Sequence, residues 1–261
     1  MAIASHGSAW LRSPDGAAVP QLSTNSTFRY VANVEFSSEP RADGVDLVRW
    51  LTSLRARGYR RLWLAQPAVP PVRNRWPYLE PHMEVAFANG GHWFALATGG
   101  SPTEAWRASW TVIEPRPADN RIWAVRYEGT PATDLAPQQL PLADARSALD
   151  ATLAGARDFA KEAGLPEWAA TLTEALETDN DRPPFQPDLM SPDFPDDSRR
   201  LIAKASRAWV FGGMGSWNDL GFESDATRAE HAEVSRLLFA TLLQACVAAV
   251  NCPLPDRSPG D

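Results

Sequence analysis

Apolar positions in the first part of the chain follow two different periods. Segments 28–36 and 59–65 are predicted as strands, the second with an apolar centre on both faces. Between them, apolar residues from Leu47 to Leu54 recur at helical spacing, with Asp43 as the predicted N-cap and Gly58 where a helix would stop. The pattern indicates a β-α-β opening.

The next part of the chain alternates with a period of two. Strands are predicted at 83–88, 92–97, 105–113 and 122–127, and Asn89-Gly90-Gly91 supplies a tight turn between the first two. The preceding segment, 66–81, contains five prolines and is predicted as an extended connection. Together these segments predict an antiparallel β-meander.

From residue 141 the period changes to that of amphipathic helices. One helix is predicted over 142–160 and ends at Gly164, and a second opens at Pro166. A third carries apolar residues over 201–209, and a long fourth continues to residue 250. Thr227 and Glu230 have capping-box form at the start of the fourth.

This order of strands followed by helices predicts an α+β fold in which about four C-terminal helices pack on one face of the sheet. The 261 residues fit a single domain. We expect a loose N-terminal arm at 1–26, a sheet-rich half at 27–130 and a helical half at 131–255 packed on the sheet. Residues 256–261 are expected to be a disordered tail.

Composition places the chain among ordinary globular proteins, with 44% hydrophobic and 22% charged residues. The longest apolar stretches fall short of the ~20 residues that span a bilayer, and no export signal is indicated. Cys246 and Cys252 are expected to be free thiols too far apart for a disulfide. These features predict a cytoplasmic protein that is not bound to a membrane.

The net charge of −7 disfavours nucleic acid as a partner, but the charge is unevenly distributed. Residues 1–130 carry 14 arginines against 11 acidic side chains, whereas residues 131–261 carry 11 basic against 21 acidic ones. One interpretation is that the arginine-rich segment 47–79 pairs within the molecule with the acidic stretch 179–197. The other is that the arginines form an anion site or meet an acidic partner.

The most distinctive segment is Gly212-Gly213-Met214-Gly215-Ser216-Trp217-Asn218-Asp219, between the third and fourth predicted helices. Its amides are candidates for an anion-binding nest. Guanidinium groups suit phosphate or carboxylate, so the candidate ligand-binding arginines are Arg60, Arg61, Arg73 and Arg75. The segment lacks the spacing of a P-loop, a dinucleotide fingerprint or a nucleophile elbow. The structural alternative is a tight helix-to-helix corner capped by Asn218 or Asp219 and plugged by Trp217.

This segment, read from residue 209 as Trp-Val-Phe-Gly-Gly-Met-Gly-Ser-Trp-Asn-Asp, resembles an uncharacterised bacterial protein family. Phe159-Ala160 and Trp168-Ala169 upstream contribute to the resemblance, which covers the C-terminal half. It implies no activity, ligand or cofactor.

The histidines and tryptophans do not match the spacing of a known metal, catalytic or binding site. The predicted hairpin separates His82 and His92 too far to share a metal ion, and His231 is expected to be solvated in a polar helical stretch. No metal site, cofactor or catalytic residue is therefore predicted. The tryptophans of the meander favour a packed core over a binding platform.

Two hypotheses on function follow. The first is a cytosolic, non-catalytic binding protein of the immunity, antitoxin or adaptor kind that presents an acidic surface to a basic partner protein. The second is an enzyme or sensor for a small anionic ligand held at 212–215 with arginine assistance. The absence of a catalytic template favours the first.

Overall fold

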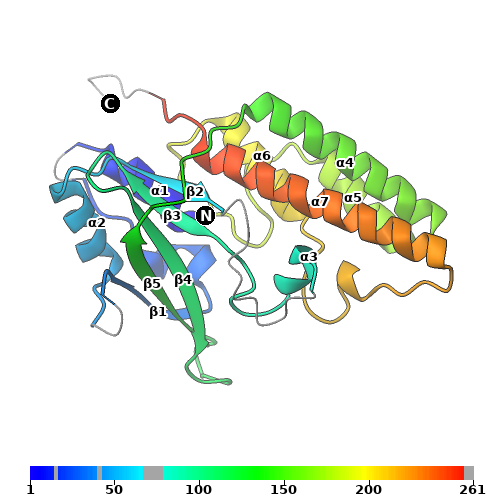
Figure 1. The fold of residues 1–261 in the computed structure, drawn as a ribbon, viewed down its shortest axis with the longest axis horizontal. Coiled ribbons are helices and arrows are strands. Elements are labelled where there is room, and N and C mark those ends of the chain that lie inside the picture. Colours follow the sequence, from blue (N-terminus) through cyan, green and yellow to red (C-terminus); the bar gives the residue numbers. More distant parts are fainter. Residues whose placement is uncertain (15–16, 40–42, 67–78, 256–261) are drawn as a thin grey trace.

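The computed structural model describes residues 1–14, 17–39, 43–66 and 79–255. It is an α+β fold built on a mixed five-stranded sheet, with helices at both ends of the molecule (Figure 1). The strand order is β1-β5-β4-β3-β2. The strands are β1 Val31–Ser37, β2 Arg61–Ala65, β3 Phe94–Thr98, β4 Glu104–Val112 and β5 Trp123–Pro131.

The sheet differs from the predicted meander in two respects. β1 pairs in parallel with β5, whereas the other neighbouring strands are antiparallel, so the sheet is mixed. The strand predicted at 83–88 is wrong, because Pro81–Glu84 forms the short helix α3 and Glu84 is buried. β2 takes the place beside β3 instead, through a long connection whose central part lies outside the described residues.

The opening elements form where the pattern predicted them, but their arrangement differs. β1 and β2 lie at opposite edges of the sheet, and α2 (Leu47–Ala56) connects them in the chain. The N-cap of α2 is Asp46 rather than Asp43, because the Asp46 carboxylate accepts a hydrogen bond from the Arg49 amide at 2.8 Å. Gly58 follows the end of α2 and has a φ of +87°, so the predicted glycine stop of this helix is confirmed.

The expected loose N-terminal arm is instead a buried helix, α1 (Ala2–Leu11), which is followed by two short 3-10 helices at Leu22–Thr24 and Ser26–Phe28. Nine of its ten residues are buried, so it has no polar face and leaves no helical period in the sequence. Its small residues allow close packing. A Cβ added at Gly7 would stand 2.5 Å from a methyl carbon of Leu62 in β2.

The free side of edge strand β2 is covered by side chains from both ends of the chain. The Ser8 hydroxyl of α1 donates to the Leu62 carbonyl at 2.7 Å and accepts from the Leu62 amide at 2.9 Å. Further along, the Asn251 side chain exchanges two hydrogen bonds of 2.8 Å with the backbone of Leu64. These two side chains take the place of a neighbouring strand and block further edge pairing.

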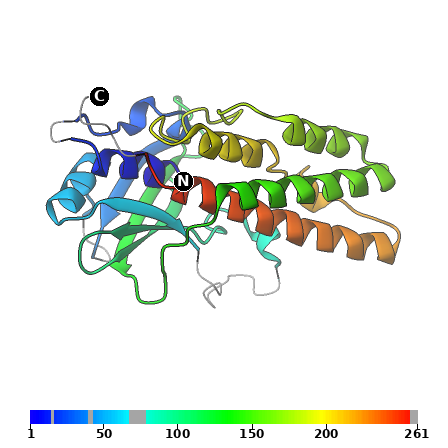
Figure 2. The ribbon, with the colours of Figure 1, turned by 90° about the horizontal axis from the view of Figure 1, so that it is seen from above.

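Four α-helices follow the sheet. They are α4 Leu142–Glu162, α5 Pro166–Glu177, α6 Asp196–Arg207 and α7 Asp225–Asn251. They extend away from the β2 edge as a bundle (Figure 2). The sequence predicted that they would lie across one face of the sheet, and the structure differs in this respect. α7 begins earlier than predicted, with Ser224 as its N-cap, which accepts from the Thr227 amide. Gly164 ends α4 with a φ of +71°.

α7 joins the bundle to the sheet. It packs against α4 and α6 and reaches β2, and one apolar cluster contains side chains from both halves of the chain. α7 is long and apolar enough to cross a membrane by composition alone. However, 61% of its apolar window is buried inside the protein, as in the core helix of a globular fold.

The sheet core is aromatic. Phe36 of β1 stacks on Trp50 of α2 with ring centroids 4.0 Å apart, and Trp106 of β4 meets Trp50 edge-on at 5.2 Å. Trp106 also covers Gly129 on the neighbouring strand, where an added Cβ would lie 2.7 Å from its ring. The core interpretation of the meander tryptophans is correct for Trp106, whereas Trp110 is 37% exposed.

Candidate functional site

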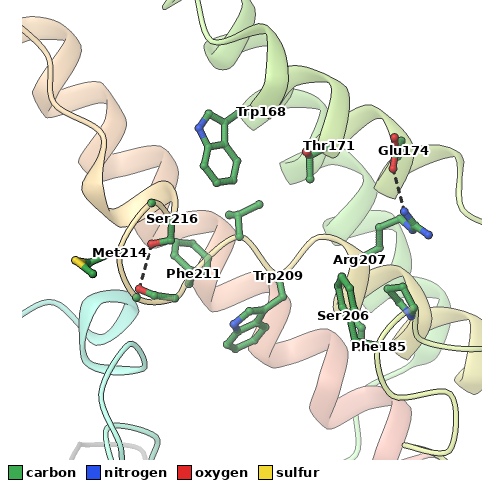
Figure 3. Close-up of a pocket in the computed structure, with 15 residues that line it drawn as sticks. Trp168, Thr171, Glu174, Phe185, Ser206, Arg207, Trp209, Phe211, Met214 and Ser216 are labelled. Atoms are coloured by element: carbon green, nitrogen blue, oxygen red, sulfur yellow. Dashed lines mark hydrogen bonds and ion pairs between the residues drawn. The ribbon is translucent and has the colours of Figure 1, made fainter.

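The glycine-rich corner, residues 212–219, connects α6 to α7. Gly215 has a φ of +80°, and its amide donates to the Asp219 carboxylate at 2.6 Å. The Ser216 hydroxyl donates to the Gly212 carbonyl at 3.1 Å (Figure 3). Trp217, Asn218 and Asp219 form a short 3-10 helix, η3, with Ser216 as its N-cap. The corner is therefore a closed turn with its own hydrogen bonds.

Trp217 anchors this corner in the helical core. Its side chain is fully buried, and its indole N–H donates to the Ser235 hydroxyl of α7 at 2.8 Å. Phe159 and Trp168 meet its ring edge-on at 6.0 and 5.7 Å. Asn218 extends the anchoring to α3, because its amide nitrogen donates to the His82 carbonyl at 3.0 Å. These contacts fix the corner between α4, α5, α7 and α3.

The hydrogen bonds of the corner bear on its suitability as an anion nest. The amides of Ser216 and Trp217 donate to the carbonyls of Gly213 and Val210, both at 3.2 Å. The amide of Gly215 is already bonded to the Asp219 carboxylate. An anionic ligand would have to displace a carboxylate that is part of the chain, so this geometry favours the structural alternative.

The candidate arginines lie elsewhere. Arg60 donates to the Arg55 and Tyr59 carbonyls at 3.2 and 3.0 Å. Arg61 donates to two carbonyls at the end of α7, those of Asn251 and Cys252, both at 2.7 Å. These two arginines line a cavity that shares no lining residue with the corner. Arg73 and Arg75 lie outside the described residues.

The ion pairs that Asp179, Asp181 and Asp196 of the acidic stretch make lie within the helical half. Asp181 pairs with Arg199 at 3.1 Å, and Asp179 lies 3.4 Å from Arg200. Within the part of the chain that the structure describes, no ion pair joins this stretch to the arginines of 47–66. The predicted pairing between the two segments is therefore not found among the described residues, and Arg73 and Arg75 lie outside them.

Beside the corner lies an open groove of about 410 Å³, which we call the corner groove. Trp168 of α5, Trp209 and Phe211 contribute aromatic rings to it (Figure 3). Two further side chains of its lining are almost completely exposed, Phe185 at 87% and Met214 at 101%. Exposed apolar side chains gathered around one concavity are typical of interaction sites. Sequence reasoning missed Phe185, which stands alone among polar and proline residues.

The end of α4 and the beginnings of α5 and α7 lie at the end of the bundle far from the sheet (Figures 1 and 2), and several acidic residues occur there. Asp158 and Asp225 there pair with Arg157 and Arg228, both at 2.8 Å or less. The other acidic side chains at this end are exposed and have no basic partner among the described residues. They are Glu162, Glu167, Glu223 and Glu230, which we call the distal acidic surface.

The histidines occupy less polar surroundings than expected. The rings of Phe222, Trp217 and Phe159 surround His231 at 5.1, 5.2 and 5.9 Å, and burial lowers its pKa. The prediction that His231 is solvated was wrong, because the face of α7 that carries His231 is turned toward these aromatic rings. His92 lies 3.4 Å from the buried Glu84 carboxylate, which the hairpin prediction could not foresee.

No cluster of three or more potential metal ligands occurs among the residues that the structure describes. Comparisons with family models, with curated proteins and with solved structures find no match to this chain. The resemblance of the corner segment to a bacterial family stays a prediction.

Proposed function

We propose that this protein is a cytosolic, non-catalytic binding protein of the immunity, antitoxin or adaptor kind, which binds a basic partner protein through its acidic helical end. The observation that carries the proposal is the distal acidic surface, where four exposed glutamates have no basic partner among the described residues. Such a predominantly negative surface accelerates encounter with a positively charged protein and selects against acidic ones.

Internal pairing occupies most of the described basic side chains of the helical half, but it does not involve these glutamates. Arg207 is held by Glu174 at 2.9 Å, Arg236 by Glu233 at 2.5 Å, and the buried Lys204 by Asp150 at 2.5 Å. At the distal end Arg157, Lys161 and Arg228 pair with Asp158 and Asp225, so the four glutamates leave a net negative charge there.

Helix stability explains only part of the surface, since Glu223 directly precedes the N-cap of α7. Glu167 lies in the first turn of α5, where the helix dipole favours a carboxylate. Glu162, by contrast, lies in the last turn of α4, where the dipole disfavours one. A carboxylate that costs local stability at an exposed position is better explained by a role in binding.

The corner groove adds an apolar contact next to this surface. Trp168 follows Glu167 in α5 and lines the groove, so charge and apolar area are adjacent. Protein interfaces combine a desolvated apolar centre with a polar rim in this way. A basic partner with one protruding apolar side chain fits both features.

The buried thiols are compatible with the proposed cytosolic location. Cys246 and Cys252 are both free and buried, and burial raises the pKa of Cys246 to about 12. Thiols of this kind are poor nucleophiles and persist in a reducing compartment.

The proposal is tested by capturing partners from a bacterial lysate at low salt, identifying them and measuring the affinity of each purified candidate. We expect a basic protein whose dissociation constant rises with salt and increases about ten-fold or more in E162K/E167K/E230K. The control D134K/E177K places the reversed charges nearer the sheet and should retain most of the affinity. Equal weakening by both variants, or a partner without a basic surface, would contradict the proposal.

A further inference from the structure

A buried carboxylate without a hydrogen-bond donor lies between α3 and α7. Glu84, the last residue of α3, is 5% exposed, and its carboxylate accepts no hydrogen bond from the residues that the structure describes. Its one ion-pair neighbour among them is His92, whose Nε2 lies 3.4 Å from the Glu84 Oε2. Neither ring nitrogen of His92 has a hydrogen-bond partner in this part of the chain. A buried charge is costly unless it is both paired and hydrogen-bonded, so Glu84 lacks part of its compensation.

The backbone around this carboxylate is closely packed. A Cβ added at Gly90 would lie 1.7 Å from the Glu84 carbonyl oxygen, so only glycine lets the chain pass this close to α3. The segment that carries His92 starts from this contact. The Asn218 side-chain amide donates to the His82 carbonyl at 3.0 Å and ties α3 to the glycine-rich corner. The Glu84 carboxylate is therefore held in place before any ligand binds.

Glu84 lines a cavity of about 220 Å³, which we call the α3 cavity. Trp93 and Phe239 contribute aromatic rings to it, and Val85 and Leu243 contribute aliphatic side chains. Its described lining contains one carboxylate and no lysine or arginine. A single carboxylate in an apolar and aromatic cavity is complementary to a positively charged group with an apolar body.

The groups around the cavity favour an organic cation over a metal ion. Burial lowers the pKa of His82, the other histidine of α3, so its ring is neutral at pH 7 and adds no positive charge. No cluster of three potential metal ligands occurs among the described residues, whereas protein metal sites commonly use three or more. An ammonium group needs one carboxylate, supplies the N–H donors that Glu84 lacks, and is attracted to the faces of aromatic rings.

We propose that the α3 cavity binds a small organic amine as its ammonium ion, with Glu84 as the counter-charge and the rings of Trp93 and Phe239 as walls. The cavity suits a ligand below drug size, because pockets for drug-sized ligands measure roughly 300–1,000 Å³. The site shares no residue with the corner groove or the distal acidic surface. It is therefore independent of the proposed partner binding.

The test is titration of the full chain with benzylamine, followed by the NMR signals of the tryptophan indole N–H groups. Benzyl alcohol is the neutral isostere, and we expect it to bind about ten-fold more weakly or less, because it brings no charge to Glu84. Glu84→Gln keeps the shape and removes the charge, so benzylamine affinity should fall about ten-fold or more. The matched control Glu80→Gln makes the same change at an exposed residue next to α3 and should bind like the wild type.

A second variant blocks the cavity without changing the carboxylate. Leu243 is half-buried on α7 and lines the cavity, so Leu243→Trp should fill it and abolish benzylamine binding. Its control, Leu237→Trp, changes an exposed position of the same helix and should leave binding unchanged. Circular dichroism and unfolding midpoints check the fold of each variant, and L243W decides if E84Q does not fold.

Three results would overturn the proposal. The first is a wild type that does not bind benzylamine, and the second is equal affinity for benzyl alcohol. The third is wild-type affinity in a folded E84Q or L243W. In any of these cases the role of Glu84 is limited to its contact with His92.

Discussion

Replacing Asn251 by alanine should destabilise the protein strongly, because this side chain completes the free edge of β2. Asn251 is fully buried, and its amide accepts from the Leu64 amide and donates to the Leu64 carbonyl, both at 2.8 Å. It also donates to the Gln138 carbonyl at 2.7 Å. A buried backbone group left without a partner costs about 1–3 kcal/mol. The two Leu64 groups alone therefore give about 2–6 kcal/mol.

The measurement is urea unfolding at neutral pH, followed by tryptophan fluorescence, with the free energy extrapolated to water. We expect Asn251→Ala to lose about 3 kcal/mol or more with an unchanged slope. Asn251→Leu fills the space without hydrogen bonds and should lose a similar amount, which separates bonding from packing. The control Asn33→Ala removes an exposed amide bonded to Glu35 and should change stability by about 0.5 kcal/mol or less. A wild-type-like Asn251→Leu would refute the reasoning.

Three further predictions concern the helical half. Gly215→Ala should cost about 1 kcal/mol because of its φ of +80°, whereas Gly213→Ala, where an added Cβ meets nothing, should be neutral or slightly stabilising in the same unfolding assay. Trp217→Ala should cost about 3–5 kcal/mol, and the exposed Trp110→Ala clearly less, as unfolding midpoints will show. Burial lowers the pKa of His231 in the folded state, so stability should fall as pH decreases below about 6.5, where the unfolded chain takes up the proton. His231→Phe should reduce the difference in unfolding free energy between pH 7.5 and 5.5, and an unchanged difference would count against this assignment.

Local signals predicted the elements whose formation depends on neighbouring residues in the chain. The alternation of β4 and β5, the amphipathic period of α4 and the glycine stops at Gly58 and Gly164 all act over a few residues. The pairing of β2 with β3 could not be read in this way, because a long proline-rich connection separates them. A hairpin was wrongly predicted at Asn89 because Asn-Gly-Gly is a typical turn sequence. Asn89 does adopt the positive φ of such a turn, +68°, but the residues before it form α3 and not a strand.

The site was recognisable only where it is continuous in sequence. The glycine-rich corner stands out because its glycines are consecutive, and its capping by Asp219 is local as well. In contrast, the cavity that Arg12, Arg55, Arg60 and Arg61 line is completed only when α1 docks on β2, which brings Arg12 to the other three. α1 itself gave no signal, because a helix buried on nearly all sides has no polar stripe to mark it.

Ser8 and Asn251 cover the free edge of β2, but during synthesis Asn251 is added much later than the strands. All five strands precede α4, so a ribosome-bound chain has its sheet residues long before Asn251 is added. At roughly 5–20 residues per second, the interval between Pro131 and Asn251 lasts about 6–24 s. Throughout it the Leu64 backbone groups are open to pairing with another nascent chain. The arrival of Asn251 in α7 thus ends the period in which this stretch of the sheet edge is open.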